Sequence, residues 1–393
     1  MDKRTIAVVF TLSALVLTSF GAILLARGYQ PDLDHKTLTS TGILVATSDP
    51  DGAEVFIDGK LAAATNSTVN LDPGTYQVKI SKDGYADWQK SVTIKKEEVF
   101  KTNAFLFPLA ADLRPLTLNG SLSPAISPDQ TRIAYGVASA SALSQGLWTI
   151  DMSGRPVIGG SDTRQIFRDT PTLALSDARA LIWSSDGREL IASSSAGQYY
   201  LLETDRLNEA PTLITSPLSV IREQWDNLTH QKLDAQLGRL DPRLLTTLAS
   251  SSADFQFSPD ETRILYEATA SASLPRIIAQ YIPGTDPTPE VRQLTPGDIY
   301  VYDLKEDRNY LISAAKFPIA NISWFPTSRH LVLHDDHQIT VMEYDGTNPA
   351  VVYAGPFEKD FVAIWPGWSK IVILTTLNSP AGVGENLYTI NLR

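Results

Sequence analysis

The chain has 393 residues, of which 43% are hydrophobic and 20% are charged, and it contains no cysteine. This length and hydrophobic content are enough for two or three domains, each with its own core. The lack of cysteine excludes disulfides, thiolate metal sites, cysteine nucleophiles and a lipid-modified N-terminal cysteine. The formal net charge of -11 argues against a nucleic-acid partner, because phosphate binding needs clustered lysine and arginine.

An uncharged apolar run, TIAVVFTLSALVLTSFGAILLA, extends from Thr5 to Ala26. As a helix it would be roughly 33 Å long at about 1.5 Å per residue, enough to cross a hydrocarbon core. Lys3 and Arg4 precede it, so the positive-inside rule favours an internal N-terminus. We therefore predict a single-pass anchor at residues 1–27 in the cell membrane, with extracellular or periplasmic C-terminal domains. A cleaved signal peptide is the alternative.

A short tether and a small β-domain are predicted next. Residues 28–41 are polar and contain proline, as is typical of a linker. Residues 42–107 alternate β-rich runs such as GILVAT, AEVFI, TYQVKI and SVTI with turn dipeptides. Asp58-Gly59 is a hairpin signal, because a type I′ turn needs positive φ at both central residues. The segment is predicted to be a compact antiparallel domain.

This segment resembles the PEGA domain along its whole length. The resemblance is carried by PDGA at 50–53, VFIDG at 55–59, LDPGTY at 71–76 and DGY at 83–85. Asp51 stands where the family name has glutamate, and residues 64–67 lack a proline that the family often has after its second hairpin. The resemblance implies an extracellular spacer or interaction module with no known catalysis.

Residues 108–393 repeat one pattern: a turn containing Ser-Pro-Asp or its remnant, an apolar strand, a variable loop and an aromatic-rich strand. Each unit offers three or four short strands, which cannot bury both faces alone, so the units should stack around an axis. The five turns are ISPD at 126–129, WSSDG at 183–187, FSPD at 257–260, WFPT at 324–327 and WPGW at 365–368.

The fold class is therefore predicted as mainly β, with a β-propeller of five or six blades after the small β-domain. The repeat resembles the TolB-like, WD-repeat-like propeller unit, in which an S-P-D-G turn precedes a strand and an L-W-x-x-D strand follows. A sixth unit would fall in residues 158–175 or 211–219, and residues 105–118 would supply the strand that closes the ring. A β-sandwich with irregular loops is the alternative.

One stretch, residues 221–248, departs from the β-pattern. Its apolar residues recur every three to five positions, as in amphipathic helices. Asp241-Pro242 is typical of an N-cap followed by proline at the first helical position, so we predict two helices with a break there. This insertion would either pack on the propeller or dock a partner. The docking residues would be Trp225, Leu228, Leu237 and Leu244.

Little in the sequence indicates catalysis. His334, Asp336 and His337 could ligate zinc, but they lie where a hairpin must turn, so we predict neither a metal nor a cofactor. The chain has no G-x-S-x-G elbow, H-E-x-x-H pair, phosphate-cradling glycine loop or dinucleotide fingerprint, so no nucleotide partner is expected. Carboxylate pairs for glycoside chemistry stay open, because their spatial separation cannot be read from sequence.

The expected function is that of a non-catalytic, membrane-anchored surface protein. Its propeller would bind a protein or a cell-wall polymer, and the PEGA-like domain would serve as a spacer. Two alternatives are a surface hydrolase or lyase that acts on glycan or peptide, and a TolB-like envelope assembly factor. The proline-rich stretch PGTDPTPEVRQLTP, residues 283–296, is predicted to be an exposed loop between two strands of one blade.

Overall fold

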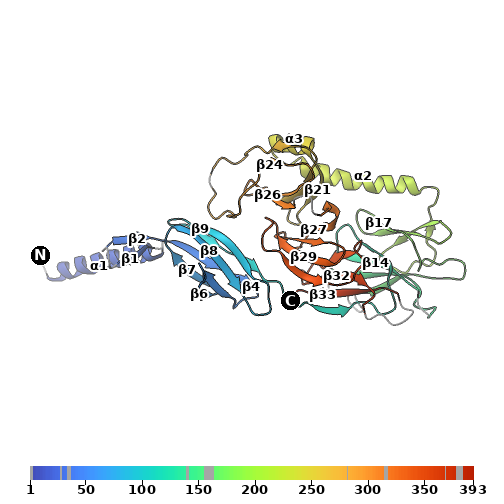
Figure 1. Ribbon diagram of the computed structural model, residues 1–393, viewed down its shortest axis with the longest axis horizontal. Coiled ribbons are helices and arrows are strands. Elements are labelled where there is room, and N and C mark those ends of the chain that lie inside the picture. The colour runs from blue at the N-terminus through green and yellow to red at the C-terminus, as the bar shows by residue number, and fades with distance from the viewer. Residues whose placement is uncertain are drawn as a thin grey trace. The chain divides into compact units, whose positions relative to one another are not determined.

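The computed structural model describes residues 3–26, 29–32, 37–138, 141–154, 163–280, 282–313, 317–367, 369–377 and 384–393. The chain divides into two compact units (Figure 1). Unit 1 comprises Met1–Leu106 and Ile278–Pro289, and unit 2 comprises Phe107–Ile277 and Glu290–Arg393. The division after Leu106 lies next to the predicted start of the repeated region. The assignment of Ile278–Pro289 to unit 1 was not predicted.

Unit 1 begins with helix α1 (Lys3–Ala26). In the described part of the chain, no helix combines the length and apolarity needed to cross a membrane, so the predicted anchor at residues 1–27 lacks support. The predicted tether contains two short strands, β1 (Tyr29–Asp32) and β2 (Thr37–Ser40), which pair antiparallel.

The rest of unit 1 is a small β-domain. One four-stranded antiparallel sheet has the order β6-β5-β8-β9, and two smaller sheets have the orders β10-β3-β7 and β11-β4. Strand β9 alternates buried and exposed residues along its length, so one face of the main sheet closes the core. Asp58 and Gly59 have φ of 48° and 77°, as the predicted hairpin turn requires. The bounds are β3 Gly42–Ala46, β4 Ser48–Asp49, β5 Glu54–Ile57, β6 Lys60–Ala64, β7 Ser67–Leu71, β8 Gly74–Ser81, β9 Trp88–Ile94, β10 Val99–Lys101 and β11 Ala104–Phe105.

Unit 2 contains five four-stranded antiparallel sheets that follow one another along the chain, one for each predicted repeat. Sheet one is β13 (Leu122–Ile126), β14 (Arg132–Val137), β15 (Gly146–Asp151) and β16 (Thr163–Arg168), and sheet two is β17 (Leu181–Trp183), β18 (Glu189–Ser193), β19 (Tyr199–Glu203) and β20 (Thr212–Leu213). Sheet three is β21 (Ser252–Phe257), β22 (Arg263–Ala268), β25 (Ile299–Asp303) and β26 (Arg308–Ser313), and sheet four is β27 (Ile322–Trp324), β28 (His330–His334), β29 (Gln338–Glu343) and β30 (Ala350–Ala354). Sheet five is β31 (Val362–Ile364), β32 (Lys370–Thr375), β33 (Asn386–Asn391) and β12 (Asp112–Pro115). Strands β23 (Ala272–Ser273) and β24 (Gln293–Leu294) form a separate pair, and η1 (Ile319–Asn321) precedes sheet four.

Sheet five joins the two ends of unit 2. Its outer strand β12 pairs with the C-terminal strand β33, so residues 105–118 supply a strand to the C-terminal sheet as predicted. The stretches considered for a sixth unit supply β16 and β20, the fourth strands of sheets one and two. Residues 155–162, within or next to the first of these stretches, and Trp368 of the fifth repeat turn lie outside the described residues.

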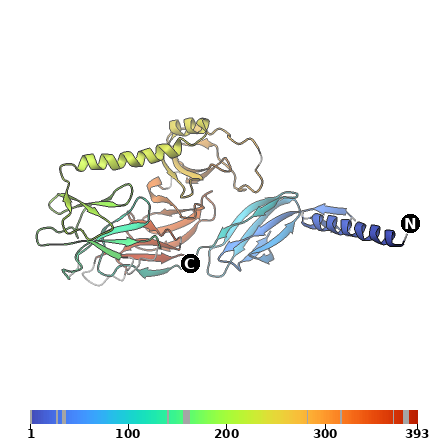
Figure 2. The ribbon, with the colours of Figure 1, turned by 180° about the vertical axis from the view of Figure 1, so that it is seen from behind.

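Buried apolar residues connect neighbouring sheets. One hydrophobic cluster joins sheets one and two, a second joins sheets one and five, and a third joins sheets three and four. Sheets two and three are linked by helix α2 (Leu218–Leu237), which runs from beside β17 to α3 next to β21 (Figures 1 and 2). In the described part of the chain no closed ring of sheets is found, so the closure of the predicted propeller lacks support.

The insertion contains the two predicted helices. The second, α3 (Pro242–Ser251), begins at the predicted break: Asp241 is its N-cap and accepts a hydrogen bond from the backbone N–H of Arg243 at 2.9 Å. Helix α3 buries Leu244 and Leu248 against sheet three. Helix α2 buries no residue, because its sequence is polar on most sides. The two helices therefore differ in role, since only α3 contributes fully buried residues to a core.

Candidate binding pocket

The repeat turns share one hydrogen-bonding pattern. In the first, the Ser127 hydroxyl donates to the Asp129 carboxylate at 2.6 Å and accepts from the Arg132 N–H at 2.9 Å. Ser258 and Asp260 repeat the serine-to-carboxylate contact at 2.8 Å. The residue after the Asp or Thr has positive φ in four turns: Gln130 57°, Gly187 69°, Glu261 55° and Ser328 59°. The third residue of these four turns, which is proline in three of them, is therefore held at an equivalent place in each repeat.

These turns meet around a cavity of about 620 Å³, which we call the turn pocket. Turns of sheets one, three, four and five contribute to its wall, and helix α2 forms one side. Four turn prolines line the pocket, Pro128, Pro259, Pro326 and Pro366. The remaining apolar wall is formed by Phe255, Phe257, Trp324 and Ile364. A pocket with this much aromatic and proline surface favours apolar side chains of a ligand.

The rim of the turn pocket carries charge. Glu261 accepts hydrogen bonds from Gln236 and Arg239, both at 2.8 Å, and these contacts keep its pKa below the ordinary value. Burial raises the pKa of Asp129, but hydrogen bonds from Ser127 and Thr131 outweigh burial and lower it. Both carboxylates are therefore ionised and already hydrogen-bonded.

Lys232, on α2, also lines the turn pocket. Its charge contributes to the low pKa of Glu261. Among the described residues its ammonium group makes no hydrogen bond or ion pair within bonding distance. Lys232 is therefore the rim charge best placed to pair with an acidic group of a ligand.

The described residues lining the turn pocket do not form a nucleophile–base pair. Ser258 is held by its turn carboxylate, and the rim carboxylates have lowered pKa values. A carboxyl group with a raised pKa lies elsewhere in unit 2, because burial and the adjacent Glu358 raise the pKa of Glu385 to about 7. Neither glutamate lines the pocket. The pocket is therefore suited to binding and not to acid–base chemistry.

The three weak metal candidates do not form a site. Among described residues, His334, Asp336 and His337 do not bring ligand atoms close enough to share one ion. Asp336 pairs instead with Lys359 at 3.3 Å, and Asp335 accepts the backbone N–H of His337 at 2.8 Å, which shapes the hairpin turn. His334 is half-buried, and burial lowers its pKa. These residues are polar because they lie at a hairpin turn.

The four residues proposed for partner docking do not form one exposed surface in the structure. Leu244 is buried and Leu237 is half-buried, and both pack in the core beside sheet three. Trp225 is half-buried on α2, and Leu228 is 54% exposed. None of the four lines the turn pocket, whereas Thr229, Lys232, Leu233 and Gln236 of the same helix do. The insertion thus reaches the pocket through another face of α2.

The pocket itself was not predicted from the sequence. The turn prolines were recognised as turn residues, but nothing showed that they share a cavity. Their recurrence in the turns of four of the five repeats was the available signal, because equivalent positions of stacked repeats lie near a common axis. Nothing in the sequence marked Phe255 and Ile364 as pocket residues, since each lies in an ordinary strand.

Comparison with known families concerns the small β-domain. Residues 41–108 match the family model described as the PEGA domain. This segment is a PEGA domain. Its hairpins and main sheet are those described above for unit 1, so the PEGA domain accounts for the fold of that part of the chain. No curated protein matches the chain.

Solved structures were also compared with the whole chain. TolB of Agrobacterium tumefaciens is 13% identical, with 86% of this chain and 78% of that chain covered and a TM-score of 0.22. TolB of Acinetobacter baumannii is 12% identical, with 80% and 59% covered and a TM-score of 0.23. A chain of the mitotic checkpoint complex is 8% identical, with 73% and 96% covered and a TM-score of 0.31. These likenesses are too distant to support an argument about function.

Proposed function

We propose that this protein is a non-catalytic surface or periplasmic protein that binds an extended segment of a partner protein in the turn pocket. The observation that carries the proposal is the cavity of about 620 Å³, walled by prolines and aromatic rings and bordered by charged residues. Such a pocket suits an extended peptide whose apolar side chains are buried while its polar groups stay at the rim.

In this proposal the five sheets are the blades of a β-propeller. Repeat turns from four of the sheets converge on one pocket, as expected for turns near a propeller axis. Helix α2 takes the chain between sheets two and three and lines the same pocket. The peptide would therefore contact both the repeat turns and α2.

We further propose that the protein associates with a membrane through α1. The described part of this helix exposes nine large apolar side chains, from Val8 to Ile23, which water solvates poorly. Location outside the cytoplasm follows the positive-inside argument. Extraction of membranes at alkaline pH tests this: the protein should stay with the lipid. Release into the supernatant would contradict it.

The pocket proposal can be tested with a displayed library of random peptides and the detergent-solubilised full chain. Selected peptides should combine aromatic or proline residues with an acidic residue. Their affinity should fall at least tenfold in Phe257→Ala and in Lys232→Glu, which remove an apolar wall and the rim cation. Leu143→Ala, at a residue 68% exposed and outside the pocket, is the matched control. Equal binding by all variants would refute the pocket as the site.

A hydrolase is the second candidate, and the pair of Glu358 and Glu385 favours it. A carboxyl group with a pKa of about 7 beside a second carboxylate can act as a general acid. Release of soluble fragments from cell-wall polymer, abolished by Glu385→Gln, would establish this activity. Absence of release by the intact protein would leave peptide binding as the function.

A further inference from the structure

Helix α2 forms one side of the turn pocket, yet it is weakly held there. None of the side chains described for Leu218–Leu237 is buried. Helix α3, by contrast, buries Leu244 and Leu248 in the core beside sheet three. The partly covered side chains of α2 are those of Leu218, Ile221, Trp225, Leu233, Gln236 and Leu237. A helix with so little buried apolar surface opens at a small cost in free energy.

The N-terminal end of α2 lacks the contacts that usually stabilise the start of a helix. Among the described residues no side chain caps it, since its N-cap residue is Pro217. The first turn, which begins at Leu218, contains no acidic residue to complement the helix dipole. Unwinding should therefore start at this end. Each unwound residue spans about 3.3 Å in place of about 1.5 Å, so unwinding also gives α2 the slack to move.

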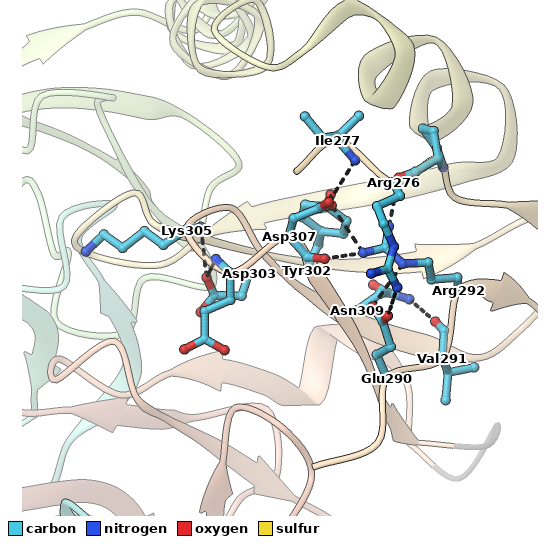
Figure 3. A network of polar contacts seen from close by, with 12 residues as sticks. Arg276, Ile277, Glu290, Val291, Arg292, Tyr302, Asp303, Lys305, Asp307 and Asn309 are labelled. Carbon is cyan, nitrogen blue, oxygen red and sulfur yellow. Dashed lines mark hydrogen bonds and ion pairs between the residues drawn. The ribbon is translucent and has the colours of Figure 1, made fainter. Parts of the chain in front are cut away.

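The C-terminal end of α2 is fixed instead. Leu237 and Leu240 pack in the hydrophobic cluster that sheet three shares with α3. Tyr302 belongs to the same cluster, and its hydroxyl donates to the buried carboxylate of Asp307 (Figure 3). Arg292 pairs with that carboxylate at 3.3 Å, so polar contacts as well as packing hold the tyrosine in place. Any motion of α2 would therefore pivot at this end.

Polar contacts with a repeat turn close α2 over the pocket. Gln236 and Arg239 both donate to the carboxylate of Glu261 at 2.8 Å, and Glu261 lines the turn pocket. The side chains of Arg239 and Glu261 are 69% and 44% exposed. An ion pair this exposed is screened by water and adds little stability. The contacts can therefore break and re-form without unfolding the sheets.

We propose that α2 is the gate of the turn pocket. It unwinds from Leu218, pivots about its C-terminal end to release Glu261, and re-forms once a peptide lies between the helix and the turns. The turns of sheets one and three are rigid by comparison, because each is closed by its own serine and aspartate. This inference rests on the proposed peptide binding and adds how the peptide enters. The pocket residues that move with the gate are Thr229, Lys232, Leu233 and Gln236.

The test compares two substitutions at Gln224, an exposed residue of α2 outside the pocket. Glycine favours the unwound chain and alanine favours the helix, so the open fraction should be about fivefold higher in Gln224→Gly than in Gln224→Ala. Hydrogen exchange of the full chain in detergent measures this opening. In the unaltered protein the amides of α2 should exchange at least tenfold faster than those of α3, and the two variants should differ about fivefold.

Binding kinetics then show whether this opening admits a ligand. The probe is a peptide from the displayed library, selected on the detergent-solubilised chain. Because a gate must open for entry and for exit, association and dissociation should both be about fivefold faster in Gln224→Gly than in Gln224→Ala, with Kd unchanged. Ala249→Gly, at an exposed residue of α3, is the matched control and should leave both rates as they are.

Two results would overturn the gate. One is exchange of α2 that is as slow as that of α3, or equal in the two Gln224 variants. The other is a peptide whose rates are equal in the two variants, or are changed as much by the control; pocket binding would then stand without a gate. A chain that binds no library peptide, although α2 opens as expected, would refute the proposed function and the role of the gate with it.

Discussion

The indole Nε1–H of Trp324 donates to the backbone carbonyl of Gln256 at 3.0 Å, so sheet four is hydrogen-bonded to sheet three. Trp183 makes the equivalent contact from sheet two to the Ala125 carbonyl of sheet one, also at 3.0 Å. In both cases the tryptophan is the first residue of the repeat turn. These two turns therefore also link their sheets to the preceding sheets.

Replacing Trp324 by Phe tests this link. The substitution keeps an aromatic ring but removes the donor, so the free energy of unfolding should fall by about 1 kcal/mol or more. Urea denaturation measures the loss. Because Trp324 lines the turn pocket, peptide affinity should fall too. Trp148→Phe, which removes a local hydrogen bond to the Ser144 carbonyl, should affect stability but not peptide affinity. Unchanged stability of Trp324→Phe would show that the contact between sheets contributes nothing.

The repeat turns should make the protein sensitive to acid. Asp129, Asp186 and Asp260 have pKa values lowered by hydrogen bonds from their turns. A lowered pKa in the folded state stabilises the protein fully above the pKa of the unfolded chain, about 4, and this stabilisation is lost as pH falls through the folded value. Stability should therefore decline below about pH 4. The triple Asp→Asn variant should show a shallower decline in urea titrations at stepped pH, and an identical slope would contradict the assignment.

Glu385 should give the stability of the protein the opposite dependence on pH. Its pKa is raised to about 7 by burial and by Glu358, so the protonated form stabilises the folded state. That stabilisation is complete below the pKa of the unfolded chain and is lost as pH rises through about 7. Thermal melting should show the midpoint falling between about pH 5 and pH 8, a window set by this raised pKa. Glu385→Gln should remove the trend, whereas Glu209→Gln, at an exposed glutamate outside this pair, should preserve it.

Two glycines with the same backbone conformation should respond differently to alanine. Gly297 and Gly346 have φ of 84° and 83°. A Cβ on Gly297 meets nothing within 4 Å, whereas one on Gly346 would stand 2.8 Å from the Leu311 carbonyl oxygen. Gly297→Ala should cost about 1 kcal/mol from the positive φ alone, and Gly346→Ala about 3 kcal/mol because backbone must also move. Urea denaturation of both variants separates the two costs; equal losses would show that the crowding is relieved without cost.

Local sequence determined most of the elements. Period-two alternation with turn dipeptides predicted the small antiparallel β-domain, and its Asp58-Gly59 turn has the backbone that those residues favour. Asp241-Pro242 marked the start of α3, because a capping carboxylate and a residue without an N–H both suit a first helical turn. The repeat turns predicted the five sheets, and three of the turns are closed by their own serine and aspartate within a few residues.

Tertiary structure decided what those elements do together. The turn prolines form a pocket only because turns from different sheets converge, and this depends on packing between residues far apart in sequence. The helical insertion does not use Leu228 or Trp225 for the pocket, since the face of α2 toward the turns is set by where its ends are attached.

The same distinction holds for the proline-rich residues 283–296. The proline-rich sequence of residues 283–296 predicted an exposed loop between two strands of one blade, but strand β24 (Gln293–Leu294) lies within this range and Leu294 is buried. Only the tertiary structure decided that Asp286 meets Lys90, a residue 196 positions earlier. An ion pair leaves no pattern in the local sequence, since attraction between charges depends on their distance in space and on the burial that surrounds them.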